Sequence, residues 1–314
     1  MSSAIDVQEV CKTFHKTRAV DEVSFSVPQG VIYGLLGPNG AGKTTTLRMI
    51  NYIIVPDTGR VLIEGTVASH TTQEWIGYLP EERGLYKKMK VGEQLMYLGR
   101  LKGLSRQNAQ ERIRYWLDRF DASDWLHKEV GELSKGMHQK IQFISTILHD
   151  PQICIFDEPF SGLDPINSEL LKKVILELKD AGKTILFATH RMEQVEQMCD
   201  HICLFNQGKV VLEGRLDEIR RSFGKNTIEL QYQGDGSFLD KLEGVRINNR
   251  SNNFAELRLL EQNDDQKILK EAMNHARIEK FELVMPSLNE IFITTVGKKP
   301  EEIANESEAE HELQ

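Results

Sequence analysis

The sequence predicts a doubly wound α/β domain over residues 1–222, followed by a smaller α/β domain over residues 223–297. Short apolar runs alternate with amphipathic helical patterns in the first domain, which is typical of a parallel sheet covered by helices. The runs VIYGLL (31–36), ICIF (153–156) and TILFA (184–188) predict strands buried on both faces. Polar residues follow each run, and open α/β sheets bind their ligands at the carboxyl ends of their strands.

A helical subdomain is predicted as an insertion into this first domain, over about residues 82–140. In this segment the sequence has long helical patterns rich in Leu, Tyr, Trp and Arg, such as GEQLMYLGRLKGL and AQERIRYWLDRF. The smaller domain contains strand-like runs (TIELQY, VRIN, FAELRLL, IEKFELVM) and helical patterns (DQKILKEAMNHA, SLNEIFITTV), which indicate two layers. Residues 298–314 carry six Glu and predict a disordered acidic tail.

The composition favours a folded cytoplasmic protein that needs a partner for any membrane role. With 40% apolar and 27% charged residues, the 314-residue chain can bury a core in each of two domains. The formal net charge of −8 provides no basic field for nucleic acid. No stretch approaches the roughly 18 to 20 apolar residues of a membrane-spanning helix, and the first residues lack the apolar region of a signal peptide.

Four scattered cysteines fit a reducing compartment rather than a disulfide framework. Cys199, His201 and Cys203 are close in sequence, but their spacing is not C-x₂-C and no second pair exists. Because apolar Ile202 and Leu204 alternate with them, we expect a strand here and no metal site.

The segment GPNGAGKT (37–44) directly follows the first predicted strand and satisfies G-x-x-x-x-G-K-[ST]. Its glycines let the backbone curl so that amides point at phosphate oxygens, with the positive end of the next helix behind them. Lys43 is expected to reach the β- and γ-phosphates and the Thr44 hydroxyl to bind Mg²⁺. A glycine-rich turn without a ligand is the alternative, but such a match arises by chance about once in a hundred chains. The predicted ATP-binding residues here are Gly37, Pro38, Asn39, Gly40, Ala41, Gly42, Lys43, Thr44 and Thr45.

Two adjacent acids, Asp157 and Glu158, follow the predicted strand ICIF. Adjacent acids at the end of a buried strand have no structural role unless a cation or a proton transfer requires them. Beside a phosphate loop, Asp157 is expected to hold Mg²⁺ and Glu158 to act as the general base on water. A solvated acidic turn is the alternative reading. His190 ends the strand TILFAT at the equivalent edge of the sheet and is a candidate to bind the γ-phosphate or orient the water. The predicted catalytic residues are therefore Lys43, Glu158 and His190.

The motifs of the first two thirds of the chain resemble the ATP-binding cassette (ABC) ATPases. GPNGAGKT is followed in that family's order and spacing by GYLPEERGLY, LSKGMHQK (133–140), ICIFDEP, SGLDP (161–165) and ATHRMEQVE. The resemblance implies a P-loop NTPase core of the ABC type, with Walker A and Walker B motifs and an inserted helical subdomain. The C-terminal appendage is similar to that of the ATPase subunits of bacterial sodium and drug exporters.

The resemblance also implies roles for residues outside the phosphate loop. LSKGM is similar to the family's signature, in which Ser134 and Gly136 lie at a helix amino terminus aimed at a γ-phosphate. In this family the signature of one subunit completes the ATP site of another, which implies a homodimer or a sibling cassette. Asp164 resembles the residue that links the two sites, and Phe14 matches the aromatic that stacks on adenine. An aromatic near a strand end is otherwise more often part of a core.

Two positions depart from the family pattern. The signature has Lys135 and Met137 where glycine and glutamine are usual, and Glu81 stands where glutamine is usual. Hard cations prefer anionic oxygen, so Glu81 is a candidate magnesium ligand and part of the predicted ATP site. The alternative is a surface ion pair with Arg83 or a nearby lysine.

The function implied by the resemblance is hydrolysis of ATP, with Mg²⁺, in the ATPase subunit of an ABC exporter. ATP would close two cassettes and drive a separate integral membrane permease from the cytoplasmic face of the membrane. The alternative is a non-transport ABC ATPase that acts as a switch or scaffold, although the chain has no second cassette and no coiled-coil or zinc insertion. A cassette that binds ATP without cleaving it conflicts with the intact Lys43, Asp157, Glu158 and His190.

Overall fold

The computed structural model describes residues 2–82, 84–260 and 265–297. The chain divides into two compact units, one ending at Gly214 and one beginning at Arg215. The boundary thus precedes helix α7 (Leu216–Ser222), whereas the sequence placed it after this helix. The side chain of Arg220 on α7 donates to the backbone carbonyls of Met285 and Pro286, which ties α7 to the second unit. The predicted acidic tail lies outside the described residues.

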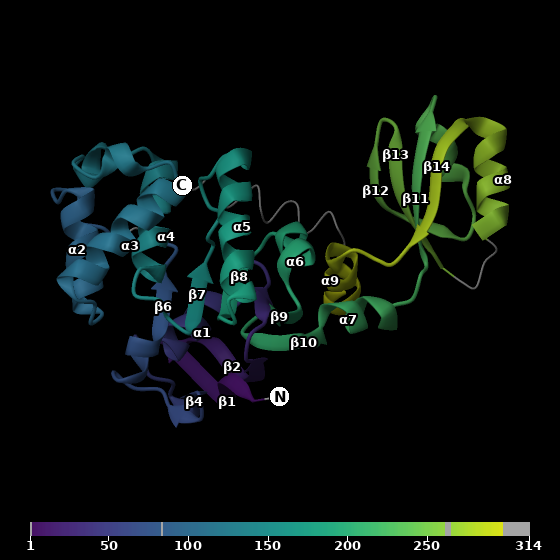
Figure 1. Ribbon diagram of the computed structural model, residues 1–314. Helices are drawn as coiled ribbons and strands as arrows, with labels where there is room; N and C mark the ends of the chain where they lie inside the picture. The colour runs from purple at the N-terminus through teal and green to yellow at the C-terminus, as the bar shows by residue number, and fades with distance from the viewer. Residues whose placement is uncertain (1, 83, 261–264, 298–314) are drawn as a thin grey trace. The chain divides into compact units, whose positions relative to one another are not determined.

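A six-stranded sheet forms the centre of the first unit, with strand order β10-β9-β3-β8-β7-β6 (Figure 1). The pairs β9-β3, β3-β8, β8-β7 and β7-β6 are parallel. All residues of β3, β7 and β8 are buried, as the apolar runs predicted. The strands are β3 (Ile32–Leu36), β6 (Ile76–Leu79), β7 (Ile153–Asp157), β8 (Thr184–Thr189), β9 (His201–Asn206) and β10 (Lys209–Arg215).

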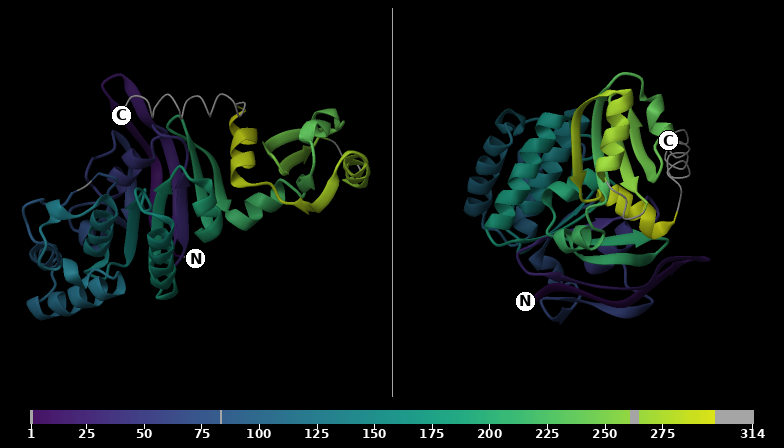
Figure 2. Two further views of the ribbon diagram at one scale, coloured as in Figure 1. Left: turned by 90° about the horizontal axis from the view of Figure 1, so that it is seen from above. Right: turned by 90° about the vertical axis from the view of Figure 1, so that its right-hand side faces the viewer.

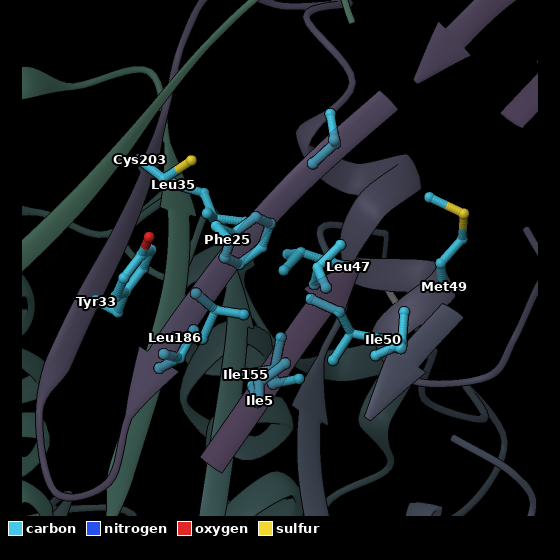
Figure 3. Packing of buried hydrophobic residues seen from close by; sticks show 14 of the residues in the cluster. Ile5, Phe25, Tyr33, Leu35, Leu47, Met49, Ile50, Ile155, Leu186 and Cys203 are labelled. Carbon is cyan, nitrogen blue, oxygen red and sulfur yellow. The ribbon is translucent and has the colours of Figure 1, made fainter. Parts of the chain in front are cut away.

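An antiparallel sheet of order β2-β1-β4-β5 makes a second layer of this unit. Its buried side chains share one core with the helix after β3 and with the central sheet. Figure 3 shows this core, in which Ile5 and Phe25 of the antiparallel sheet approach Leu47, Ile155 and Leu186. The strands are β1 (Ser3–Phe14), β2 (Thr17–Pro28), β4 (Thr58–Ile63) and β5 (Thr66–Val67).

The inserted helices group together beyond the β6 edge of the central sheet (Figure 2). They are α2 (Val91–Leu101), α3 (Arg106–Arg119) and α4 (Lys135–Ile147), so the third extends past the predicted limit near residue 140. A Cβ on Gly77 of β6 would lie 2.4 Å from the carbonyl oxygen of Thr146, so α4 packs directly against this strand. The other helices of the unit are α1 (Lys43–Ile50), α5 (Pro165–Asp180) and α6 (Met192–Met198), with short 3₁₀ turns at Thr72–Trp75, Ser123–Trp125 and Val130–Glu132.

The second unit contains an antiparallel sheet of order β12-β13-β11-β14. Apolar residues of the sheet, among them Leu230 and Leu257, form one core with Ile268 and Ala272 of α8, which makes the two layers that the sequence predicted. None of the helices within the described residues is long and apolar enough to cross a membrane. The elements are β11 (Thr227–Gln233), β12 (Val245–Ser251), β13 (Phe254–Leu259), α8 (Asp265–His275), β14 (Arg277–Val284) and α9 (Leu288–Val296), with a 3₁₀ turn at Gly236–Lys241.

Candidate nucleotide-binding and hydrolysis site

The loop between β3 and α1 has a backbone that only glycine accommodates at two positions. Gly37 has φ +147°, and a Cβ there would lie 2.3 Å from the carbonyl oxygen of Phe205. Gly42 has φ +105°, and a Cβ there would lie 2.6 Å from the carbonyl oxygen of Ala19. Gly42 also precedes α1 without a side-chain cap, so the first amides of the helix are available to an anion. The loop thus has the form of a phosphate cradle.

Lys43 is the first residue of α1, and its side chain is turned back onto this loop. Its Nζ atom donates to the carbonyl oxygens of Gly37 (2.7 Å) and Pro38 (3.0 Å). Burial lowers the pKa of Lys43, while the negative charges of Glu158, Asp157 and Glu81 act in the opposite direction. Phosphate oxygens are better partners for an ammonium group than neutral carbonyls, so the loop carbonyls occupy a place that a nucleotide can take.

The other loop residues surround the same cradle. The amide of Ala41 donates to the carbonyl of Pro38 (3.2 Å), and the carbonyl of Ala41 accepts from the amide of Gly208 (3.0 Å). These bonds fix the loop between Gly37 and α1, where Asn39 and Gly40 also lie. Thr44 and Thr45 occupy the first turn of α1 and are half-buried.

Asp157 ends β7 as a buried carboxylate with incomplete hydrogen bonding. The Thr44 hydroxyl acts to lower the pKa of Asp157, and the Oδ2 atom of Asp157 has no hydrogen-bond partner among the residues that the structure describes. Burial raises the pKa of Asp157 to about 6. An unpartnered buried carboxylate oxygen beside a hydroxyl is an oxygen donor set that suits Mg²⁺. The residues present therefore fit a magnesium ion bound together with a nucleotide.

Glu158 has a backbone conformation that is rare for a residue with a side chain, with φ +47°. Its amide donates to the carbonyl of Ala188 (3.0 Å), which fixes the turn after β7 against the end of β8. Its Oε1 atom accepts from the amide (2.9 Å) and the Nδ1 atom (2.7 Å) of His190, and its Oε2 atom accepts from Thr189 Oγ1 (3.0 Å). Burial raises the pKa of Glu158, but the bonds from His190 and Thr189 outweigh burial and lower it.

The sequence predicted His190 and Glu158 at the ends of separate strands. In the structure they form hydrogen bonds with each other. Since a carboxylate only accepts hydrogen bonds, the proton of a neutral His190 ring lies on Nδ1, and Nε2 is an acceptor. Thr189 was missed by the sequence reasoning, although it occupies the last position of the predicted strand TILFAT. Its position directly before the candidate histidine is the sequence feature that could have identified it as a site residue.

Glu81 follows β6 as an exposed residue whose negative charge acts on this site. Its carboxylate acts on the pKa values of both Lys43 and Asp157. Among the described residues Glu81 forms no ion pair, whereas Glu82 lies 4.0 Å from Arg48. Arg83, the alternative partner considered for Glu81, lies outside the described residues. The electrostatic contacts favour the interpretation of Glu81 as a site residue.

The signature segment is an exposed surface at the start of α4. Ser134 caps this helix, and its hydroxyl accepts from the amide of Met137 (3.3 Å). A Cβ on Gly136 would meet only ordinary contacts, the nearest being the carbonyl oxygen of Gly162 at 3.6 Å. The packing within one chain therefore does not require glycine at this position.

Asp164 and Phe14 also lie at the surface. Asp164 caps α5 by accepting from the amide of Asn167 (2.9 Å), and these hydrogen bonds hold its pKa below the usual value. This capping role was not predicted. Phe14, at the end of β1, is 45% exposed and has Lys12 Nζ 5.8 Å from its ring centroid, so it is not a core residue.

Comparisons with known proteins agree with these motifs. Residues 20–161 match the family model described as ABC transporter, and residues 214–296 match that of the ATP-binding protein DrrA1-3-like, C-terminal domain. The second match begins at the boundary between the two compact units. The matched segments therefore cover most of both units.

Curated proteins and a solved structure are similar to this chain over most of its length. The uncharacterized ABC transporter ATP-binding protein YhaQ of Bacillus subtilis is 45% identical over 93% of this chain and 98% of its own length. The daunorubicin/doxorubicin resistance ATP-binding protein DrrA of Streptomyces peucetius is 31% identical over 98% of this chain and 97% of its own. A solved ATP-binding subunit of an ABC transporter is 32% identical with a TM-score of 0.67, covering 71% of this chain and 94% of that chain. This chain belongs to the ATP-binding subunits of ABC transporters, the family that hydrolyses ATP to drive transport.

Proposed function

We propose that this chain powers an exporter by using Glu158 to activate the water that attacks ATP, with His190 holding that carboxylate. The observation that carries the proposal is the pair of adjacent acids with opposite environments. Asp157 is buried with an unpartnered oxygen and a raised pKa, while Glu158 is held ionised by hydrogen bonds. A free buried oxygen suits a metal ligand, and the ionised carboxylate is the form that can accept a proton from water.

Mg²⁺ would be held by Thr44 and Asp157, with Glu81 as a further candidate ligand. When bound with ATP, the ion neutralises negative charge on the phosphates. The cradle of Gly37 to Gly42 and the amino end of α1 bind the phosphates through backbone amides. Lys43 then exchanges its loop carbonyls for phosphate oxygens, which keeps its buried charge paired.

In the hydrolytic step, Glu158 accepts a proton from water while the water oxygen bonds to the γ-phosphorus. The bond from the γ-phosphorus to the bridging oxygen breaks, and that oxygen leaves with ADP. His190 fixes one oxygen of Glu158 through two hydrogen bonds, and its Nε2 atom, an acceptor in the neutral ring, can take a hydrogen bond from the water. In this proposal Glu158 is the base and His190 the residue that holds it.

The substitution Glu158→Gln tests this assignment. The variant keeps the shape of the site but cannot take a proton, so turnover should fall by roughly 10²- to 10⁴-fold while ATP still binds. Bound ATP should then accumulate in a stable dimer, seen as a larger species by size-exclusion chromatography with ATP and Mg²⁺. The matched control is Glu111→Gln on the exposed side of α3, which should release phosphate at the wild-type rate. Phosphate release near that rate from Glu158→Gln would remove Glu158 from its proposed role.

A second cassette is proposed to complete the ATP site. Ser134, Asp164 and Phe14 are exposed in the single chain, and no packing requirement within the chain explains Gly136. A helix amino terminus that presents a serine and a glycine suits a phosphate on another molecule. Two copies of this chain, or one copy and a sibling cassette, would each supply one half of two sites.

Mixing two defective chains tests whether the signature acts across such an interface. Lys43→Ala removes the phosphate contact and Ser134→Arg blocks the signature, so each chain alone should be inactive. A heterodimer contains one site with both defects and one with neither, and ATPase activity should therefore return on mixing. If heterodimers form, as shown by differently tagged chains, and no activity returns, then the signature does not work in trans.

The membrane partner is proposed to be a separate permease on whose cytoplasmic side this chain binds. Tyr86, Tyr97 and Leu101 are large apolar side chains that are 58%, 49% and 69% exposed on α2 and the segment before it. Exposed aromatic and aliphatic side chains in one region are typical of protein interfaces. The match of the second unit to a C-terminal domain of DrrA-like proteins favours export over a non-transport switch or scaffold.

A further inference from the structure

Thr189 ends β8 with its side chain fully buried between the strand end and Glu158. Its Oγ1 atom lies 3.0 Å from Glu158 Oε2 and accepts a hydrogen bond from the amide of Arg191 at 3.1 Å. Gln194 Oε1 lies at 3.4 Å on another side. Thr189 is therefore the centre of a small network on the side of Glu158 that His190 does not reach.

The direction of these hydrogen bonds follows from counting protons. A hydroxyl has one proton, and the amide of Arg191 already uses Thr189 Oγ1 as an acceptor. The proton then has two possible acceptors, Glu158 Oε2 at 3.0 Å and Gln194 Oε1 at 3.4 Å. The carboxylate is nearer and charged, and 3.4 Å is long for a bond between two oxygens. The hydroxyl of Thr189 thus donates to Glu158.

The two oxygens of Glu158 have different numbers of donors within the described part of the chain. Oε1 accepts two hydrogen bonds, both from His190, which occupy its two lone pairs. Oε2 accepts one, from Thr189. A lone pair remains on Oε2, so Oε2 is the oxygen that can take a proton from water.

We infer that Thr189 is a positioning residue for hydrolysis, because its hydroxyl aims the basic oxygen of Glu158. This inference deepens the proposed function and depends on Glu158 being the general base. Glu158 needs such support on both sides because its backbone has a strained φ of +47°. Lys43 and Asp157 act on Glu158 through their charges. Within the described residues, the hydrogen bonds to its carboxylate come from His190 and Thr189.

The variants Thr189→Val and Thr189→Ser separate this role from simple packing. Valine keeps the shape of threonine but has no hydroxyl, whereas serine keeps the hydroxyl and loses the methyl group. Thr189→Val should lower kcat about tenfold, the scale of losing one hydrogen bond to a charged group, with KM for ATP changed less than about twofold. Thr189→Ser should retain kcat within about twofold of wild type. Measurements use the full chain with ATP and Mg²⁺, and ATP binding at equilibrium verifies that each variant is folded.

Combining Thr189→Val with Glu158→Gln gives an additional test. If Thr189 acts through Glu158, the double variant should be no slower than Glu158→Gln alone, since the two changes remove one function. A further tenfold loss in the double variant, or equal losses in Thr189→Val and Thr189→Ser, would assign Thr189 to packing and overturn the inference.

The variants Glu158→Gln and Thr189→Val distinguish a wrong role for Thr189 from a wrong role for Glu158. If Glu158→Gln abolishes turnover but Thr189→Val leaves kcat unchanged, the general base stands and the role of Thr189 is wrong. If Glu158→Gln itself turns over at the wild-type rate, the proposed function fails first. Should Thr189→Val not fold, Thr189→Ala compared with Thr189→Ser gives the same contrast in hydroxyl content with smaller side chains.

Discussion

Asp157 in the first unit and Glu290 in the second are equally buried carboxylates, 1% and 2% exposed, in different surroundings. Glu290 accepts from the hydroxyl of Thr227 (2.8 Å) on one oxygen. Its other oxygen also has no hydrogen bond among the described residues, but the Arg258 guanidinium lies 3.5 Å from it. Asp157 has the Thr44 hydroxyl and an oxygen with no partner among the described residues. The nearby cation, Lys43, is directed at loop carbonyls instead.

The contrast shows how to tell a structural buried charge from a functional one. A buried carboxylate is costly unless a cation and hydrogen bonds satisfy it. The second unit supplies a cation and a hydroxyl from its own chain, so Glu290 links α9 to β11 and β13. No cation within the described residues is paired with Asp157, so we expect its counter-charge to arrive with the nucleotide.

The largest effect is expected from removing the charge of Glu290. Glu290→Gln removes the carboxylate that pairs with Arg258, which should destabilise the second unit by about 3 kcal/mol, the lower end for a broken buried ion pair. Hydrogen exchange of amides in β11 and α9 measures this loss locally, which matters because a two-unit chain need not unfold in one step. The ATPase rate of the isolated subunit should stay at the wild-type value.

An exposed pair in the same unit provides the control for that experiment. Glu282 lies 2.9 Å from Lys280, but its side chain is 55% exposed. Glu282→Gln should therefore leave local stability close to that of the wild type. Equal losses from Glu282→Gln and Glu290→Gln would mean that burial does not distinguish these two carboxylates, and the contrast with Asp157 would lose its basis.

A smaller effect on the Mg²⁺ dependence of the ATPase rate is expected at Glu81. This variant tests whether a second acid besides Asp157 binds the metal. Glu81→Gln replaces a charged oxygen with a neutral carbonyl, so half-maximal ATPase rate should need several-fold more free Mg²⁺. The matched control is Glu82→Gln, whose carboxylate is directed towards Arg48. Superimposable Mg²⁺ titrations of wild type and Glu81→Gln would exclude metal ligation and leave Glu81 as a surface residue.

Much of the fold and of the nucleotide site could be predicted because local sequence determines both. The buried strands β3, β7 and β8 are continuous apolar runs, and the cradle around Gly37 requires a short motif that is contiguous in sequence. The roles of Asp157 and Glu158 followed from their place at a strand end. These roles remain predictions that the variants above address.

The contacts between these residues could not be predicted, because they depend on strand register. Asp157 pairs with Ala188 across β7 and β8, and this register brings the next residues, Glu158 and Thr189, side by side. A shift of one residue would move Thr189 to the other face of the sheet. The domain boundary was misplaced for a similar reason, since the bonds of Arg220 to residues near 285 are invisible to local patterns.

We expect Mg²⁺ and nucleotide to supply the missing partner of the buried Asp157 carboxylate. Burial raises the pKa of Asp157 to about 6. Without ligand, ionisation of Asp157 therefore destabilises the folded state increasingly as the pH rises from the pKa of the unfolded state to about 6, and the penalty is constant above that pH. Asp157→Asn should therefore have a higher Tm than the parent without ligand at pH 7.5, and the difference should vanish near pH 4.

The most direct measurement compares Tm at pH 7.5 with ATP alone and with ATP plus Mg²⁺, in chains that also carry Glu158→Gln to prevent turnover. The chain with Asp157 should gain further stability when Mg²⁺ is added, because ligands that bind the folded state raise Tm. Asp157→Asn should start higher and gain little from Mg²⁺. An equal Mg²⁺-dependent rise in both chains would contradict the claim that Asp157 holds the metal.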